Sequence, residues 1–232
     1  LVEMPPRACF DNGTPAPPIP SMTRPTSLWN LSSSVALAWT ATGGATVLNT
    51  DVRTRRAPYN ALAPTGSVPL VTETTARSRT VTGVPGGTTL CASTRARDIW
   101  AQISDWSAQS CTSVPLTPAQ LTKGKGVKAK AAAGTYAGKV LSATKKGATI
   151  SRSGVKAKRL ALVVTTCASC GKVKVYLGSD LLRTVSLKSS GTRKKVVVSI
   201  ATFSWIRTGT VKVKVVSSGK KVLVEGLGVS KV

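Results

Sequence analysis

The chain contains no histidine and only eight acidic residues in 232 positions. Without histidine it cannot form a Ser-His-Asp or Cys-His nucleophile, or a mixed Cys/His zinc site. Eight carboxylates also make a paired-acid active site or an oxygen-rich calcium cage difficult to assemble. We therefore expect no catalysis, no metal and no cofactor in this chain.

Long apolar runs and aromatic side chains are scarce as well. No run approaches the roughly 18 apolar residues of a transmembrane helix, and the longest, such as residues 160–164, have the length of a strand. We therefore expect no membrane span. No signal peptide is visible and the first residue is Leu1, so we interpret the chain as a piece of a longer exported protein with further domains upstream.

What is abundant is positive charge, and it is unevenly distributed. Residues 1–118 hold nine arginines, no lysine and six acids, whereas residues 119–232 hold nineteen lysines, five arginines and two acids, which gives net charges of +3 and +22. The change falls at a proline-containing stretch, residues 114–118, which indicates a domain boundary. We predict an N-terminal remnant or linker at 1–17, a first domain at 18–116, a basic linker at 117–133 and a second domain at 134–232.

Five cysteines cannot all pair within one chain. Cys91 lies in one alternating stretch and Cys111 begins the next, so two consecutive antiparallel strands would place them side by side. A disulfide closing a loop of that length stabilises a fold by about 3 kcal/mol. The pairing favours an oxidising, extracellular setting, either secreted or on the cell surface.

Cys167 and Cys170 form a Cys-x-x-Cys motif that is open to three interpretations. A redox site would place the pair at the start of a helix, but the alternating residues 171–176 that follow indicate a strand. A zinc site would need two further ligands from another domain. We favour a disulfide that closes a turn, with a redox or metal site as the alternatives. Cys9 remains unpaired in this chain, and we expect its partner upstream.

Short alternating stretches separated by Gly/Pro turns, without helical periodicity, predict a β-sandwich for the first domain. The same stretch resembles a fibronectin type III domain of secreted actinobacterial proteins. The resemblance rests on Trp39, residues 51–53, 80–85 and 95–98, and on Asp105-Trp106-Ser107. It implies a spacer or adhesion domain. Family members usually carry Tyr at the positions of Thr50 and Leu90, so we expect looser packing and a greater dependence on the disulfide.

The second domain is predicted to be a β-sandwich too. In residues 211–215 valines alternate with lysines, which indicates a half-buried sheet with a cationic outer face. Residues 178–180 and 217–220 are predicted hairpin turns. The stretch resembles the jelly-roll, carbohydrate-binding-like modules of secreted bacterial proteins through residues 134–138, 146–149, 171–176 and 224–227. The predicted fold class is therefore all-β, with two β-sandwiches in tandem.

The lysines are the candidate ligand-binding groups of the second domain. The candidates for binding an anionic polymer are Lys172, Lys174, Lys212, Lys214, Lys220 and Lys221. Charge of this kind binds polyanions such as cell-wall polymers or acidic polysaccharides, although a solvated face that maintains solubility would look the same. Nucleic acid is not expected, because the interleaved aromatics that stack single-stranded bases are missing.

Two functions remain at this point. The first is a non-catalytic exported spacer or adhesion module that attaches to the cell wall or to an anionic polymer. The alternative is an accessory carbohydrate-binding region of a larger secreted hydrolase. For that role Trp29, Trp100 and Trp106 could line a sugar platform, but the Trp-Ser context of Trp106 favours packing on the sheet.

Overall fold

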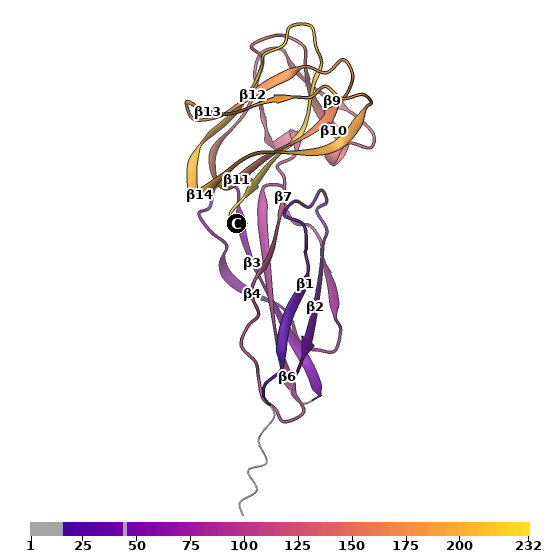
Figure 1. The fold of residues 1–232 in the computed structure, drawn as a ribbon, viewed down its shortest axis with the longest axis vertical. Helices are drawn as coiled ribbons and strands as arrows, with labels where there is room; N and C mark the ends of the chain where they lie inside the picture. The colour runs from indigo at the N-terminus through magenta and orange to yellow at the C-terminus, as the bar shows by residue number, and fades with distance from the viewer. Residues whose placement is uncertain (1–15, 44–45) are drawn as a thin grey trace, which may run out of the picture.

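The computed structural model describes residues 16–43 and 46–232 as two all-β lobes stacked end to end (Figure 1). The first lobe holds strands β1 to β7, and the second lobe holds β8 to β15 together with two 3-10 turns. The turns are η1 (Pro118–Gln120) and η2 (Tyr136–Gly138). The all-β prediction is thereby confirmed.

The first lobe consists of two antiparallel sheets, of three and four strands. The three-stranded sheet has the order β1-β2-β5, and the four-stranded sheet has the order β4-β3-β6-β7. The strands are β1 (Ile19–Arg24), β2 (Val35–Thr42), β3 (Val47–Pro58), β4 (Thr65–Thr74), β5 (Ser78–Val81), β6 (Thr88–Asp98) and β7 (Ser110–Val114).

Alternation along β2 builds the core between these two sheets. Val35, Leu37 and Trp39 are each 1% exposed, because every second side chain of a strand points to the same face. The indole Nε1–H of Trp39 donates to the hydroxyl of buried Thr50 at 2.8 Å. Thr50, which occupies a position where tyrosine was expected, therefore satisfies the one polar atom of the largest core side chain.

The second lobe is one eight-stranded antiparallel sheet that folds over on itself. Its order is β13-β12-β14-β11-β15-β10-β9, with β8 pairing with β11. The strands are β8 (Thr122–Lys123), β9 (Val127–Ala131), β10 (Lys139–Ala143), β11 (Thr149–Thr166), β12 (Lys172–Leu177), β13 (Asp180–Ser186), β14 (Arg193–Val215) and β15 (Val222–Ser230).

The two longest strands, β11 and β14, pair along nearly their whole lengths and pass through both halves of the folded sheet. Register breaks between Arg152 and Val155, and between Ala157 and Arg159, mark where they bend. Valines and leucines from both halves, such as Leu162, Val173 and Val213, meet inside as one core. The alternating Lys and Val residues of β12 and β14 thus place valine inside and lysine outside.

The lobes are joined by a packed interface. The backbone groups of Leu116 and Leu227 exchange two hydrogen bonds, at 2.8 and 3.0 Å. A Cβ added at Gly228 would lie 2.7 Å from the ring of Trp29, so this ring rests directly on the β15 backbone. The Tyr59 carbonyl accepts from the Lys156 N–H and from the Lys231 ammonium, each at 2.9 Å. These contacts fix the orientation of one lobe on the other.

Several sequence expectations differ from this structure. The expected basic linker, residues 117–133, contains η1, β8 and β9, because the edge of β10 offers partners to Val127–Ala131. Residues 217–220 do not close a hairpin, since β11 lies between β14 and β15. The 178–180 turn does join the paired strands β12 and β13.

Candidate functional site

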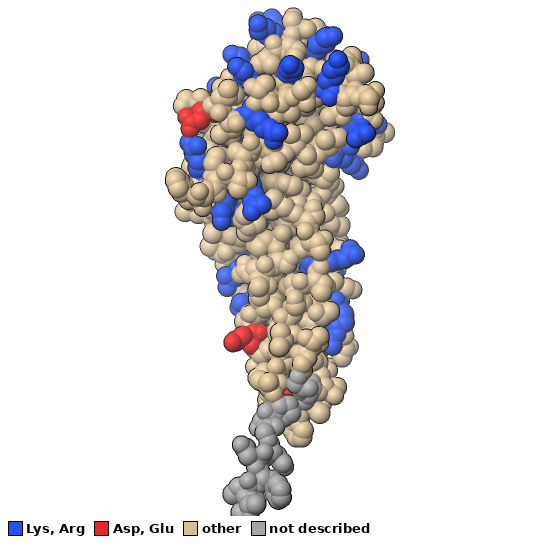
Figure 2. Space-filling model, in the orientation of Figure 1, with Lys and Arg blue, Asp and Glu red and all other residues tan. Residues whose placement is uncertain are grey.

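The exposed face of β12 and β14 carries four of the six candidate lysines. Lys172 and Lys174 stand on β12, and Lys212 and Lys214 stand on β14, with Lys174 directly opposite Lys214. Alternate residues of a strand lie about 7 Å apart and neighbouring strands about 5 Å apart, so the ammonium groups originate from a compact grid. Figure 2 shows Lys and Arg side chains distributed over the second lobe, with uncharged surface between them.

Hydroxyl side chains border the lysines on both sides. On β13, Ser186 stands opposite Lys172 and Thr184 opposite Lys174. On β11, Thr149 stands opposite Lys214 and Ser151 opposite Lys212. We call this surface the lysine–hydroxyl face, defined by Lys172, Lys174, Lys212, Lys214, Thr149, Ser151, Thr184 and Ser186. Its eight side chains end in ammonium or hydroxyl groups. The half-buried Tyr176 opposite Lys212 and the exposed Leu181 opposite Tyr176 continue the surface beyond them.

Lys220 and Lys221 do not stand on the strands of this face. They lie in the connection after β14, where the Lys221 carbonyl accepts from the Gly171 N–H at 2.8 Å. Both are exposed and lie beside the start of β12, so they extend the positive charge beyond Lys172.

The two acids of the second lobe do not neutralise this face. Glu225 is fully buried and accepts hydrogen bonds from the Tyr136 N–H, the Thr165 hydroxyl and the Lys195 N–H, at 2.6, 2.6 and 3.0 Å. Asp180 pairs with Arg207 at 2.6 Å, and this guanidinium lowers the pKa of the carboxyl below its ordinary value. Across residues 16–43 and 46–232, none of the six candidate lysines forms an ion pair.

The structure pairs the four predicted disulfide cysteines. Cys91 and Cys111 stand opposite each other on β6 and β7 and are bonded. Cys167 and Cys170 are bonded across a turn before β12, and a Cβ added at the following Gly171 would lie 3.0 Å from the Lys220 side chain. This arrangement agrees with a turn-closing bridge. Cys9 lies outside the described residues.

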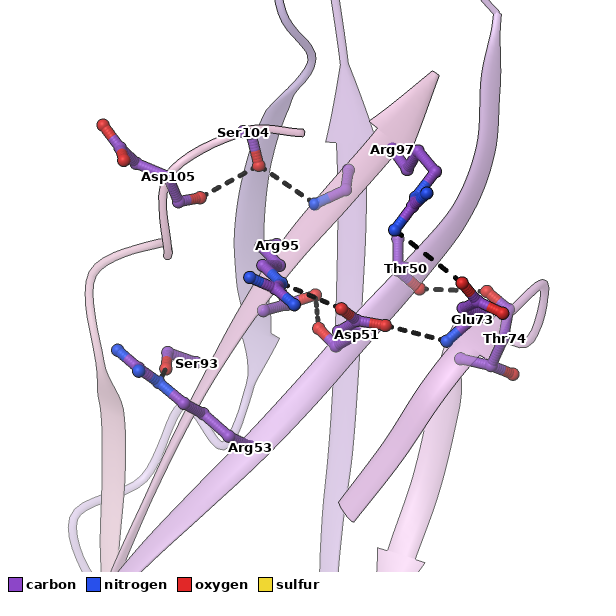
Figure 3. Close-up of polar contacts among 12 residues, drawn as sticks. Thr50, Asp51, Arg53, Glu73, Thr74, Ser93, Arg95, Arg97, Ser104 and Asp105 are labelled. Atoms are coloured by element: carbon purple, nitrogen blue, oxygen red, sulfur yellow. Dashed lines mark hydrogen bonds and ion pairs between the residues drawn. The ribbon is translucent and has the colours of Figure 1, made fainter. Parts of the chain in front are cut away.

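The first lobe contains a second polar cluster, around Asp51 on β3 (Figure 3). The Asp51 carboxylate accepts from the Arg95 Nε–H and from the Glu73 backbone N–H, both at 2.8 Å. Burial would raise the pKa of Asp51, but these two donors outweigh it and lower the pKa below its ordinary value. The neighbouring Arg53 donates its Nε–H to Ser93 at 3.0 Å.

Two arginines of this cluster stack on Trp106. The Arg53 and Arg95 Cζ atoms lie 4.0 and 4.9 Å from its ring centroid. Trp106 therefore packs on the sheet, as its sequence context indicated. Trp29 packs on Gly228 in the lobe interface, whereas Trp100 is 61% exposed in a turn after β6. The three tryptophans have separate surroundings and do not form one sugar platform.

The described residues contain no group of three or more His, Cys, Asp or Glu side chains arranged to hold a metal ion. Their helical segments are single 3-10 turns, none of which could cross a membrane.

Comparison with known proteins assigns no family. Neither a family model nor a curated protein sequence matches the chain. Among solved structures, a xanthan lyase from Paenibacillus matches at 12% identity, with 94% of this chain and 25% of that chain covered and a TM-score of 0.39. An α-L-rhamnosidase from Dictyoglumus thermophilum matches at 13% identity, with 92% and 25% covered and a TM-score of 0.38. An exo-β-1,3-galactanase from Phanerochaete chrysosporium matches at 10% identity, with 87% and 64% covered and a TM-score of 0.38. These neighbours are carbohydrate-active enzymes, but the scores are too low to assign a function.

Two features of these surfaces could not be predicted from the sequence. The hydroxyl rows bordering the lysines depend on strand register. Thr184 and Ser186 on β13 pair with β12, and Thr149 and Ser151 on β11 pair with β14. The stacking of Arg53 and Arg95 on one indole depends on the path of residues 104–107 across the sheet. Alternation of Asp51, Arg53 and Arg55 along β3 was the available signal that these side chains share a face.

Proposed function

We propose that this chain is a non-catalytic, extracellular attachment module that binds an anionic polymer of the cell surface through the lysine–hydroxyl face. The carrying observation is the cross-strand pair of Lys174 and Lys214, on a face without a carboxylate in the described structure. Like charges directly opposite each other destabilise a sheet. A ligand that supplies negative charge removes this repulsion, so binding converts an unfavourable arrangement into a favourable one.

The residue types favour a phosphate- or carboxylate-bearing polymer over a nucleic acid. Ammonium and hydroxyl groups both donate hydrogen bonds to anionic oxygens, and each lysine here has a hydroxyl residue opposite it. Stacking of single-stranded bases requires exposed aromatic rings. Only Tyr176, which is half-buried, stands among these residues.

The first lobe fits the role of a spacer. We propose that residues 18–116 form a fibronectin type III domain and that the second lobe is a jelly-roll module. The strand orders β1-β2-β5 and β4-β3-β6-β7 in two facing sheets support the first assignment. The interface at Leu116 and Gly228 would hold the second lobe rigidly at the end of this spacer. The Cys91–Cys111 bond supports an extracellular setting.

A second candidate function is an accessory carbohydrate-binding region of a larger hydrolase. The observation in its favour is Trp205 on β14, whose side chain is 73% exposed. Tryptophan, which combines a large apolar ring with one polar N–H, is enriched at binding interfaces. This function predicts binding to a neutral polysaccharide at high salt, which charge alone would not give.

The experiment is co-sedimentation with isolated cell walls, with the same walls stripped of their anionic polymers, and with insoluble neutral polysaccharides. We expect binding to intact walls at low salt that is lost on stripping and weakened at high salt. Equal binding to intact and stripped walls would contradict the proposal. Retention on one neutral polysaccharide at high salt, lost on Trp205→Ala, would favour the accessory function instead.

A further inference from the structure

A pocket of about 150 Å³ opens on the four-stranded sheet of the first lobe, away from the lysine–hydroxyl face. Arg53 and Arg95 reach it from neighbouring strands, and Trp106 lies over the sheet beside them. The edge strand β4 forms its other wall. Ser67, Pro69 and Thr72 line this wall.

Both guanidinium groups keep donors available at this pocket. The Nε–H of Arg53 is used by Ser93 and that of Arg95 by Asp51. Within the described part of the chain, the terminal nitrogens of neither group have a hydrogen-bond acceptor. Stacking on Trp106 holds the planar groups in place, so their terminal N–H groups are arranged before a ligand arrives.

The surroundings are short of negative charge. Asp51 forms an ion pair with Arg95, and Glu73 lies 3.7 Å from Arg97. Among residues 16–43 and 46–232, Arg53 has no acidic partner. Arg55 follows on the same face of β3, two residues along from Arg53. Burial, followed by the nearby charges of Arg55 and Arg95, lowers the pKa of Arg53. An anion placed beside Arg53 would relieve this repulsion.

We propose that this pocket binds the carboxylate of a hexuronic acid residue in an acidic polysaccharide. The carboxylate would lie against the terminal N–H groups of Arg53, in the forked geometry that guanidinium groups form with carboxylates. The hydroxyls of Ser67 and Thr72 would face the hydroxyls of the sugar, and Pro69 would contact its ring. The first lobe would thereby add a specific contact to the charge-based binding of the second lobe.

An acidic peptide fits this site less well than a sugar. An extended peptide gains most of its affinity by pairing with the free edge of a sheet, and here that edge is β4. Pro69 lies in the middle of β4 and has no N–H to donate, and the pairing of β4 with β3 breaks register three times. The edge is therefore a poor template for an added strand.

The test uses the full chain and three soluble probes: trigalacturonate, its fully methyl-esterified form and hexaglutamate. Calorimetry measures Kd, and ¹H–¹⁵N spectra follow the arginine Nε–H groups. We expect trigalacturonate to shift the Nε–H signals of Arg53 and Arg95, and esterification to raise Kd at least tenfold because it removes the charge. Equal affinity for the ester, or for hexaglutamate, would overturn the proposal.

Variants locate the site. Arg53→Gln should raise Kd by about tenfold, because it removes the charge and the forked donors. Arg53→Lys should also raise Kd, because lysine keeps the charge but lacks the fork. The matched control Arg79→Gln removes one exposed charge from β5, in the other sheet, and should leave Kd within twofold. Unchanged affinity in Arg53→Gln would refute the assignment, and the wild-type Nε–H shifts decide the matter if that variant does not fold.

The two proposals are separable. A variant with all four lysines of the lysine–hydroxyl face changed to glutamine should lose binding to cell walls and keep its Kd for trigalacturonate. Loss of trigalacturonate binding in that variant would place the oligosaccharide on the second lobe and overturn the inference.

Discussion

Lys231 offers a pH-dependent test of the lobe interface. Its side chain is buried, and its ammonium donates to the carbonyls of Tyr59 and Lys156 without an acidic partner in the described residues. Burial, with a smaller effect from the charge of Lys156, lowers its pKa from 10.5 to about 8. The unfolded chain therefore binds this proton more tightly than the folded chain does.

The sign of the effect follows from this difference. Below pH 8 the ammonium is charged in both states, and its burial opposes folding. Between pH 8 and 10.5 the folded protein releases the proton first, so the free energy of unfolding rises with pH. From pH 7.5 to pH 10 the rise from this one group is about 2 kcal/mol. Measurements should stop at pH 10, since burial raises the pKa of Tyr136 to about 12 and its unfolded form ionises above pH 10.

The assay is urea unfolding, at several pH values, of the wild type and of Lys231→Met. The variant retains the other charges, so subtracting its free energy of unfolding from that of the wild type isolates the contribution of Lys231. We expect the difference to change by about 2 kcal/mol in favour of the wild type between pH 7.5 and pH 10. A difference that stays constant with pH would refute the reasoning.

Two further predictions concern the disulfide and the lobe contact. Replacing Cys91 and Cys111 by serine opens a bridge of sequence separation 20 and should lower the stability of the first lobe by about 3 kcal/mol; an unchanged melting temperature would contradict it. Gly228→Val would drive a side chain into the ring of Trp29 and should separate the lobes, seen as a larger maximum dimension in small-angle scattering. Gly191→Val, at a position with open space around it, is the control and should scatter like the wild type.

Much of the second lobe could be predicted from the period-two pattern. Val211 to Val215 alternate so regularly with lysine that the direction of each side chain follows from the backbone. What the pattern could not supply was register. The opposition of Lys174 and Lys214, and the hydroxyl rows beside them, depend on which strands become neighbours, and those strands are distant in sequence.

Strands β1 and β4 could not be predicted from the local sequence, and both for the same physical reason. β1 contains Pro20, and β4 contains Gly66 and Pro69, residues that are unfavourable in the interior of a sheet. Both strands lie at a sheet edge, where one side of the backbone needs no partner. Tertiary pairing with β2 and β3 therefore decides their conformation, and local preference does not.

The expected linker was mispredicted for a related reason. Residues 123–133 are rich in Lys, Gly and Ala and contain one large apolar residue, Val127, a composition typical of a flexible segment. In the structure Val127–Ala131 pairs with β10 through backbone hydrogen bonds, and its lysines Lys128 and Lys130 are exposed. An edge strand with charged side chains needs little hydrophobic pattern of its own.

The salt dependence of polyanion binding tests the central claim most directly. Two variants each remove four charges from the second lobe. The face variant changes Lys172, Lys174, Lys212 and Lys214 to glutamine. The edge variant changes to glutamine four exposed lysines on or next to β9 and β10, namely Lys125, Lys128, Lys130 and Lys139.

For a soluble polyphosphate polymer, the slope of log K against log salt concentration counts the phosphates neutralised on binding. We predict that the slope of the face variant falls in magnitude by about three relative to the wild type, while that of the edge variant falls by less than about one. Equal slopes for the two variants would show that the polymer responds to total charge, and would contradict a binding site at the lysine–hydroxyl face.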